Sequence, residues 1–203
     1  MFTGLIEGTG RVVRTGGGVL VVSGGVLEGA GPGESVSVDG ACLTVTGSEG
    51  GEVTFHLSEE TVARSVAAGY ARGTTVNLER PVTAGGRFHG HLVTGHVDCT
   101  GQVKRAVPSG TDRRVDISLE EAFRDLVVEK GSVAVSGISL TVSSVEEGAF
   151  GVVLIPETLE RTTAGSWKPG TRVNLEFDIL GKYVLKHLGS RERESRLRAY
   201  LEE

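Results

Sequence analysis

An internal duplication constrains the fold of this chain more than any other feature. Four segments of the first half recur in the second half in the same order. The matching pairs are 3–12 with 94–103, 35–45 with 132–142, 60–64 with 157–161, and 73–79 with 170–176. The offset is 91 residues for the first pair and 97 for the later pairs, so one insertion of 6 residues separates the copies.

A period this long indicates a duplicated domain, because solenoid repeats span only about 20 to 50 residues. Each copy, at roughly 90 residues, is large enough to close one small hydrophobic core. The sequence therefore predicts domains over residues 1–91 and 92–180, followed by a tail over 181–203. A doubled domain suits a function that needs two related pockets, so the positions at which the copies differ are the most informative.

Charge and hydropathy narrow the range of partners. The chain has 21 Lys and Arg residues against 26 Asp and Glu residues, a formal net charge of -5. No cluster of basic residues interleaved with aromatic residues occurs, so nucleic acid is not expected as a partner. The sequence also lacks a secretory leader and a run of about 18 apolar residues. We expect a cytoplasmic protein without membrane contact.

Alternating apolar residues predict a fold made mostly of strands. Residues 36–38, 53–57, 76–78, 115–119 and 173–177 carry apolar side chains at every second position, which is typical of half-buried strands. Glycine is abundant, with 31 residues, and glycine-rich turns separate the alternating stretches. This pattern predicts an all-β chain with an antiparallel barrel or sandwich in each copy.

Helices are expected in only a few places. Residues 59–70 and 157–165 form equivalent short helices in the two copies, and Ser118 to Glu121 has the spacing of a capping box that would begin another helix. The tail from Lys182 onward has apolar residues at helical spacing and acidic and basic pairs four positions apart. The apolar stripe of this helix is a candidate subunit contact.

Histidines supply the most metal-like spacing in the chain. His89, His91 and His96 form a His-x-His-x4-His pattern, and two of them would share a face of a strand. The acidic and histidine ligands that should follow downstream are absent. We therefore interpret them as connection or pocket residues and expect no metal.

Two differences between the copies mark candidate chemistry. Cys42 of the first copy corresponds to Ser139 of the second, each preceded by a glycine two positions earlier and followed by a threonine two positions later. The alternative is a buried, inert cysteine. His96 corresponds to Leu5, so only the second copy has a titratable group there, and an imidazole transfers protons near neutral pH.

These segments together resemble the riboflavin synthase family of alpha-chain type. The matching segments, in the order of that family, are 1–8, 40–45, 90–97, 137–142 and 155–163. The resemblance covers nearly the whole chain. Two positions depart from the pattern: Asp39 stands where Asn is frequent, and Ser136 stands where an acidic residue is usual.

The resemblance implies a fold and a reaction. The expected fold is two homologous six-stranded antiparallel β-barrels of the flavin-reductase type plus a C-terminal α-helix that assembles a homotrimer. The expected reaction is a dismutation of two molecules of 6,7-dimethyl-8-ribityllumazine, which yields riboflavin and 5-amino-6-ribitylamino-uracil without a cofactor. Association with lumazine synthase is a further expectation from the same resemblance.

The resemblance also implies the residues of the site. The candidates for the reaction itself are Phe2, Ser35, Cys42, His96 and Thr141. The substrate contacts implied in the first copy are Gly4, Leu5, Ile6, Cys42, Leu43, Thr44, His56, Leu57, Ser58, Glu59, Glu60 and Thr61. Those implied in the second copy are Gly95, His96, Val97, Lys130, Ser139, Leu140, Thr141, Val153, Leu154, Ile155, Pro156, Glu157 and Thr158.

Two alternatives remain open from the sequence. Lumazine proteins share the doubled fold and hold the ligand without catalysis, but retention of Phe2, Cys42, His96 and Thr141 favours the enzyme. A flavin-binding reductase domain is the second alternative, and the lack of a nicotinamide-binding half argues against it.

Overall fold

The structure is a computed structural model that describes residues 1–188 of the 203-residue chain, and it contains two closed β-barrels. The strands of the first barrel are β1 (Gly8–Gly16), β2 (Val19–Ser23), β3 (Ser35–Val38), β4 (Ala41–Glu49), β5 (Glu52–His56) and β6 (Thr75–Glu79). Those of the second are β7 (Cys99–Ser109), β8 (Asp112–Ser118), β9 (Ser132–Val135), β10 (Ile138–Glu146), β11 (Ala149–Leu154) and β12 (Arg172–Phe177). The predicted fold class of two six-stranded antiparallel barrels is confirmed.

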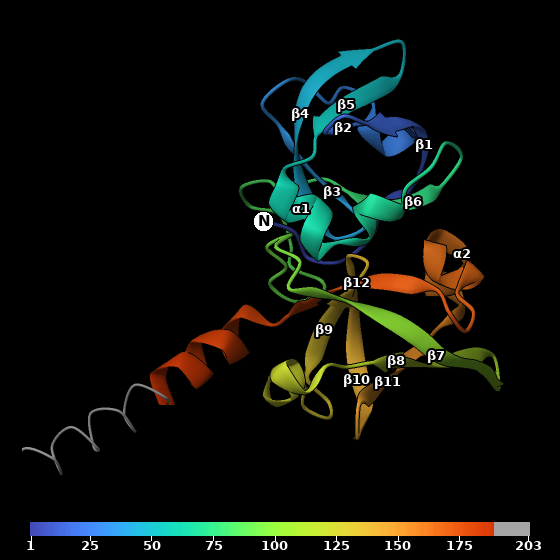
Figure 1. Cartoon of the computed structure of the whole chain (residues 1–203), viewed down its shortest axis with the longest axis vertical. Coiled ribbons are helices and arrows are strands. Elements are labelled where there is room, and N and C mark those ends of the chain that lie inside the picture. Colours follow the sequence, from blue (N-terminus) through green and yellow to red (C-terminus); the bar gives the residue numbers. More distant parts are fainter. Residues whose placement is uncertain (189–203) are drawn as a thin grey trace, which may run out of the picture.

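The two barrels have the same topology. Around the first barrel the neighbours are β1-β2-β5-β4-β3-β6, and around the second they are β7-β8-β11-β10-β9-β12, with every pairing antiparallel. Closure removes the unpaired strand edges that an open sheet would expose. Figure 1 shows the first barrel, in blue and teal, above the second, in green to orange.

Each barrel encloses its own hydrophobic core. The alternation along a strand is clear in β4, where Ala41, Leu43 and Val45 are buried in the first core while Cys42 and Thr44 face outward. The equivalent strand β10 buries Ile138, Leu140 and Val142 in the second core. The outward face of these two strands is therefore free to build a site.

Helical elements are short, as expected. They are α1 (Glu59–Arg64), α2 (Pro156–Arg161) and the 3-10 helices η1 (Gly25–Leu27), η2 (Val66–Gly69), η3 (Glu121–Leu126) and η4 (Thr163–Ser166). The expected capping box at Ser118 is wrong. Ser118 belongs to strand β8, and its hydroxyl accepts a hydrogen bond from the backbone N–H of Gln102 in β7, so pairing of the strands took precedence over the local helix signal.

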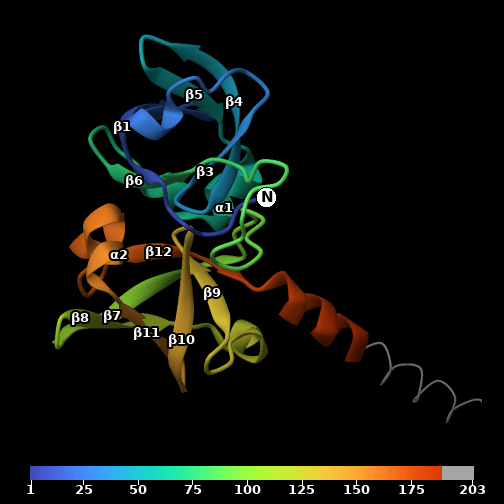
Figure 2. The ribbon, with the colours of Figure 1, turned by 180° about the vertical axis from the view of Figure 1, so that it is seen from behind.

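A final helix begins at residue 179 and is described as far as residue 188. It extends away from both barrels (Figures 1 and 2). Leu180, Tyr183, Val184 and Leu188 on it are each more than half exposed. The remainder of the expected tail, with Leu197, Tyr200 and Leu201, lies outside the described residues.

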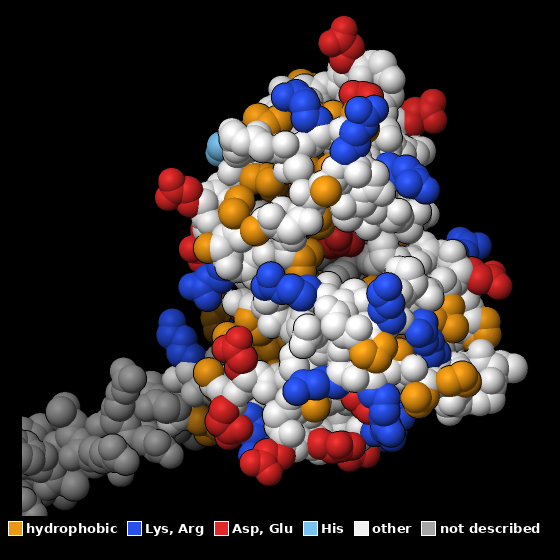
Figure 3. All heavy atoms as spheres, turned by 45° about the vertical axis from the view of Figure 1, so that its right-hand side comes forward, with side chains coloured by type: hydrophobic (Ala, Val, Ile, Leu, Met, Phe, Trp, Pro, Cys, Tyr) orange, Lys and Arg blue, Asp and Glu red, His pale blue; other side chains and the backbone are white. Residues whose placement is uncertain are grey.

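The connection between the barrels runs from the end of β6 at Glu79 to the start of β7 at Cys99. The predicted domain boundary between residues 91 and 92 falls inside this connection and stays a prediction. Within residues 1–188, no helix is long and apolar enough to cross a membrane. Figure 3 shows one face, on which acidic and basic side chains are mixed over both barrels and a hollow lies between them.

Two matching hairpin turns join the barrels. Asp39-Gly40 and Ser136-Gly137 each connect two strands through residues of positive φ, the conformation of a tight two-residue hairpin. The turns meet tip to tip, because a Cβ added to Gly40 would lie 2.6 Å from the backbone nitrogen of Gly137. Only glycine permits this approach.

Reciprocal asparagines complete the junction. The Asn77 side chain donates to the carbonyl of Ser136 at 2.9 Å, and the Asn174 side chain donates to the carbonyl of Asp39 at 2.7 Å. The side-chain oxygens of the same two residues accept the backbone N–H groups of Thr163 and Val66 in the opposite barrels. The duplication therefore produces an interface with approximate twofold symmetry.

Candidate functional site

The segments that precede the two barrels are exchanged between them. Ile6 comes just before the first barrel but is buried in the core of the second, and Val97 comes just before the second barrel but packs against the core of the first. The carbonyl of Gly4 accepts the N–H of Ser139 at 2.8 Å, and the carbonyl of Gly95 accepts the N–H of Cys42 at 2.8 Å. Strands β4 and β10 are therefore each bordered by a segment that belongs to the other copy.

Buried carboxylates hold these segments in place. Glu176 accepts hydrogen bonds from the backbone N–H and hydroxyl of Thr94 at 2.6 and 2.7 Å and from the N–H of Gly95 at 2.9 Å. Glu79 holds Thr3 and Gly4 in the same way. Burial raises the pKa of Glu79, and the hydrogen bonds from Thr3 and Gly4 oppose that rise.

The first pocket, here called pocket A, has a volume of about 230 Å³ and lies between the first barrel and the exchanged segment of the second copy. Its walls are Ala41, Cys42, Glu60, Thr61, Arg64, Ser65, Gly95, His96 and Val97. Six of these were predicted as substrate contacts: Cys42, Glu60, Thr61, Gly95, His96 and Val97. The sequence placed them in different copies, and the structure brings them together.

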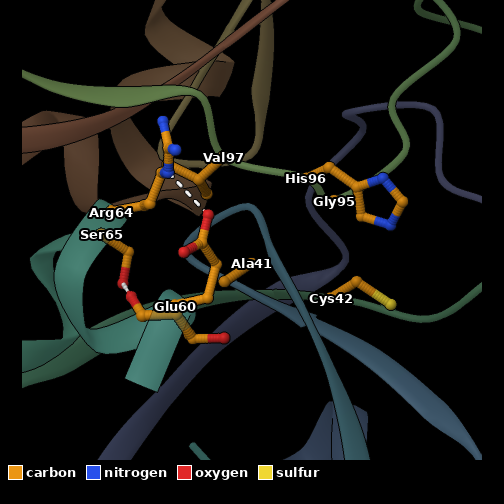
Figure 4. Close-up of a pocket in the computed structure, with 9 residues that line it drawn as sticks. Ala41, Cys42, Glu60, Arg64, Ser65, Gly95, His96 and Val97 are labelled. Carbon is orange, nitrogen blue, oxygen red and sulfur yellow. Dashed lines mark hydrogen bonds and ion pairs between the residues drawn. The ribbon is translucent and has the colours of Figure 1, made fainter. Parts of the chain in front are cut away.

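Cys42 and His96 form one side of pocket A. In Figure 4 the Cys42 side chain and the His96 ring extend in the same direction, away from Glu60 and Arg64. The latter two form an ion pair of 2.7 Å. The close approach of the backbones requires glycine at position 95, because a Cβ there would meet the Cys42 Cβ at 2.6 Å. A thiol and an imidazole, side chains of the types that serve as nucleophile and proton carrier in enzymes, thus border the same space.

The other predicted contacts of the first copy lie around pocket A or in the core beneath it. Thr44 is exposed on the same outward face of β4 as Cys42. Ser58 caps α1 by accepting the N–H of Thr61, and His56 and Glu59 beside it are exposed. Leu43 and Leu57 are buried in the core of the first barrel, so their side chains support the pocket from below.

Ser35 lies outside the walls of pocket A. It pairs with Thr44 across β3 and β4 and borders a neighbouring hollow that is also lined by Leu5 and Glu34. Phe2 is completely buried and packs with Val93, Ala134 and Cys42. Phe2 therefore contacts the site through Cys42 and not through the pocket itself.

Pocket B is the name used here for the residues that correspond, by the approximate twofold symmetry, to the walls of pocket A. Ser139 lies against Gly4, and Leu5 stands where pocket A has His96. Thr141, Val153 and Ile155 are exposed around it. Ile6, a predicted contact of the first copy, lies in the second core together with the predicted contacts Leu140 and Leu154. The remaining predicted contacts of the second copy, in the loop and helix at its edge, are Lys130, Pro156, Glu157 and Thr158.

The histidines do not converge on one point. His91 Nδ1 lies 2.7 Å from the Ser139 hydroxyl in pocket B, whereas His96 lines pocket A. Within residues 1–188, no group of three His, Cys, Asp or Glu side chains is arranged to hold a metal ion.

The second cysteine is a structural residue. Cys99 begins β7, and burial, with smaller contributions from Glu120 and Asp98, raises the pKa of its thiol to about 12. Such a thiol stays protonated at neutral pH and is a poor nucleophile.

Several residues of the site were not identified as functional from the sequence. Glu79, Glu176 and Arg64 belong to the repeated segments, so recurrence in both copies was a signal that could have identified them. Asn77 and Asn174 recur in the same way. The contact of His91 with Ser139 gave no such signal, because it joins the connection to a strand 48 residues away.

Comparisons with known proteins agree with this geometry. The family model described as a lumazine binding domain matches residues 3–81 and again 94–178. The riboflavin synthase of Mycobacterium tuberculosis (strain ATCC 25618 / H37Rv) is 43% identical over 193 residues, which cover 91% of this chain and 96% of that protein. The riboflavin synthase of Actinobacillus pleuropneumoniae is 38% identical, with 93% and 90% covered.

Solved structures show the same fold. LumP complexed with riboflavin superposes with a TM-score of 0.81 at 19% sequence identity, covering 87% of this chain and 99% of that one. At this identity the likeness concerns the fold alone. The duplicated lumazine-binding domains and the full-length relatives together place the chain in the riboflavin synthase family.

Proposed function

We propose that this chain catalyses the dismutation of two 6,7-dimethyl-8-ribityllumazine molecules to riboflavin and 5-amino-6-ribitylamino-uracil, as a transferase of a four-carbon unit. One observation carries the proposal: two symmetry-related sets of site residues, each assembled from both copies, lie on one chain whose relatives are riboflavin synthases. Two molecules of one substrate require two related pockets.

The reaction needs proton transfer and close alignment of two rings. The atoms of two lumazines equal those of the two products, so no co-reactant is consumed. One lumazine loses a proton from its C7 methyl group, and the other accepts the resulting carbon nucleophile after activation at C7. Alignment of two reactants in neighbouring pockets can lower a barrier by roughly 7 to 11 kcal/mol.

The walls of pocket A suit these steps. His96 is the candidate for moving protons, and acid–base catalysis of this kind contributes roughly two to four powers of ten. Cys42 is the candidate for addition to, or polarisation of, the acceptor ring, with Ser35 beside the same strand face. Thr141 is the candidate on the opposite pocket, and Phe2 supports Cys42 by packing.

The complete site is proposed to lie between two subunits. Pocket A, at about 230 Å³, is below the roughly 300 to 1,000 Å³ usual for ligand pockets. We infer that a homotrimer places the first barrel of one subunit against the second barrel of its neighbour. The exposed apolar residues of the final helix, Leu180, Tyr183, Val184 and Leu188, support a subunit contact there. Cytoplasmic location and association with lumazine synthase stay predictions.

The test is to incubate the purified chain with 6,7-dimethyl-8-ribityllumazine alone, at neutral pH with a chelator. We expect two lumazines to be consumed for each riboflavin formed. Binding with no riboflavin formed would instead indicate a lumazine carrier.

The role of His96 has its own test in the same assay. His96→Ala should lower kcat by at least a hundredfold with little change in lumazine affinity, and full turnover by this variant would exclude the proton-transfer role.

A further inference from the structure

We propose that His91 is a positioning residue that makes the two pockets chemically different, by fixing the Ser139 hydroxyl of pocket B and filling the space beside it. This inference rests on the proposed function, since it concerns how pocket B holds its lumazine. Its first support is the contact of 2.7 Å between His91 Nδ1 and Ser139 Oγ.

The connection between the barrels lies directly on Ser139. The N–H of His91 donates to the carbonyl of Thr3 at 3.2 Å, which continues the short antiparallel bridge between Phe2 and Val93. A Cβ added to Gly90 would lie 2.1 Å from the Thr3 carbonyl oxygen and 2.9 Å from the Ser139 Cβ. Gly90 and His91 therefore close over this part of pocket B.

Pocket A has no such cover over the matching residue. Cys42 corresponds to Ser139 and is held by Gly95 as Ser139 is held by Gly4. Within residues 1–188 the Cys42 thiol makes no hydrogen bond, and it borders the open pocket together with His96. The exchange of backbone segments is symmetric, whereas the contact made by His91 is not.

The protonation of His91 decides what Ser139 offers to a ligand. Burial lowers the pKa of His91, opposed by Asp178, so the ring is neutral at physiological pH. Its Nε2 atom is buried without a partner within the described residues. A buried N–H group without an acceptor is rarer in proteins than a buried nitrogen lone pair without a donor. The unpartnered Nε2 is therefore the nitrogen without a proton, and the proton of the neutral ring lies on Nδ1.

In that tautomer His91 donates to Ser139 Oγ, and the Ser139 hydroxyl proton is free to point into pocket B. Ser139 then donates a hydrogen bond to a carbonyl or ring nitrogen of the heterocycle. Pocket B thus holds its ligand by a fixed donor, while in pocket A the Cys42 thiol, without a hydrogen-bond partner among the described residues, can act as a nucleophile.

The experiment measures riboflavin binding by calorimetry, because riboflavin alone cannot turn over. The wild-type protein should bind at two classes of site per chain. His91→Ala should weaken one class by about tenfold, the effect of losing one buried hydrogen bond, and leave the other class unchanged. His91→Asn, whose side-chain amide can donate in place of Nδ1, should restore most of that loss.

Two further variants test whether His91 affects binding through Ser139. If His91 acts through Ser139, His91→Ala combined with Ser139→Ala should bind as weakly as Ser139→Ala alone. Phe88→Ala, which changes an exposed side chain of the same connection three residues away, is the control and should behave as wild type. The unchanged class of site reports that the variants are folded.

Equal weakening of both classes, or no weakening of either, would overturn the proposal. So would strictly additive losses in the double variant. A wild-type protein that binds riboflavin at two classes of site but forms none from lumazine would refute the proposed activity and leave the role of His91 standing.

Discussion

Single residues differ in reactivity because the fold gives equivalent side chains different surroundings. Cys42 and Cys99 are both free thiols and both half-buried, but only Cys42 borders pocket A. The pKa of Cys99, at about 12, leaves about one thiolate in ten thousand at pH 8. Exposure to the pocket therefore separates a candidate nucleophile from an inert thiol.

We predict that iodoacetamide at pH 8 alkylates Cys42 well before Cys99, and that lumazine slows this reaction. Peptide mass spectrometry after timed quenching would measure both rates. Cys99→Ser should leave the fast phase intact, and Cys42→Ser should remove it. Faster labelling of Cys99, or no protection by lumazine, would contradict the assignment of pocket A.

Asp39 is a buried carboxyl in one of the two hairpin turns that join the barrels. It accepts hydrogen bonds from the N–H of Asn77 at 2.7 Å and the hydroxyl of Tyr70 at 2.9 Å. Within residues 1–188 no cationic side chain pairs with it. Burial raises the pKa of its carboxyl from 3.8 to about 7, although both hydrogen bonds oppose the rise.

A raised pKa means that the folded protein binds this proton more tightly than the unfolded chain does. The stabilisation from Asp39 is therefore fully present below about pH 4 and is lost as the pH rises through about 7. We predict that Asp39→Asn raises the free energy of unfolding at pH 8 by about 1 to 3 kcal/mol and changes it little at pH 4.

Urea unfolding of both proteins at pH 4, 6 and 8 would measure this difference. The asparagine oxygen can still accept from Asn77, and its amide can donate to Tyr70, so the contacts are kept while the charge is removed. An effect of equal size at pH 4 and pH 8 would show that packing, and not ionisation, is responsible.

At the scale of elements, the exchanged segments are positioned by carboxylates at the ends of β6 and β12. Glu176 holds the segment that carries His96, and Glu79 holds the segment that carries Leu5. The two carboxylates make the same hydrogen bonds, but one positions an imidazole and the other an apolar side chain. Variants of the two residues therefore test whether the position of the His96 segment limits the rate of the reaction.

We predict that Glu176→Gln lowers kcat by roughly tenfold, because one charge-assisted hydrogen bond to Thr94 or Gly95 is lost and His96 moves. Glu79→Gln should raise KM for lumazine and change kcat by less than about threefold, since it shifts only the apolar Leu5. Steady-state kinetics on both variants would decide. An identical loss of kcat in both variants would show that Glu176 and Glu79 act only by stabilising the fold.

The paired hairpins are the second decisive element. A methyl group at Gly40 would meet the backbone of Gly137 at 2.6 Å, whereas a methyl group at Gly33, also at positive φ, would meet nothing within 4 Å. Both glycine positions carry the strain of positive φ, roughly 1 to 2 kcal/mol for alanine. Only Gly40 adds a clash between the barrels.

Gly40→Ala is therefore expected to lose about 1 to 3 kcal/mol more stability than Gly33→Ala. Denaturant unfolding at one pH would measure the two values. Equal losses would mean that the barrels separate at no cost, which would contradict a rigid junction.

At the scale of the whole molecule, the proposed site depends on more than one chain. The final helix presents Leu180, Tyr183, Val184 and Leu188 to solvent in the single chain. We predict that Leu180→Glu with Val184→Glu converts the proposed trimer to monomers, measured by light scattering, and lowers turnover by at least tenfold. Full turnover by a monomer would place the complete site within one chain.

The fold itself was determined by the local pattern of the sequence. Period-two alternation fixed the strands, because each pleat sends successive side chains to opposite faces, and the duplication fixed two barrels. The pattern failed at Ser118, whose spacing suits a helix cap but whose hydroxyl is used across β7 and β8. A local helix-capping pattern does not decide the structure where pairing with a neighbouring strand supplies the hydrogen bond instead.

The site was only half determined by the sequence. Differences between aligned copies identified Cys42, His96 and Ser139, because an alteration in a repeat is visible without coordinates. The sequence could not show that Gly95 meets Cys42 and Gly4 meets Ser139, or that His91 bonds Ser139. Those contacts join residues up to 135 positions apart. Which residues meet depends on how the two closed barrels pack against each other at their glycine turns, and only the tertiary structure decides that packing.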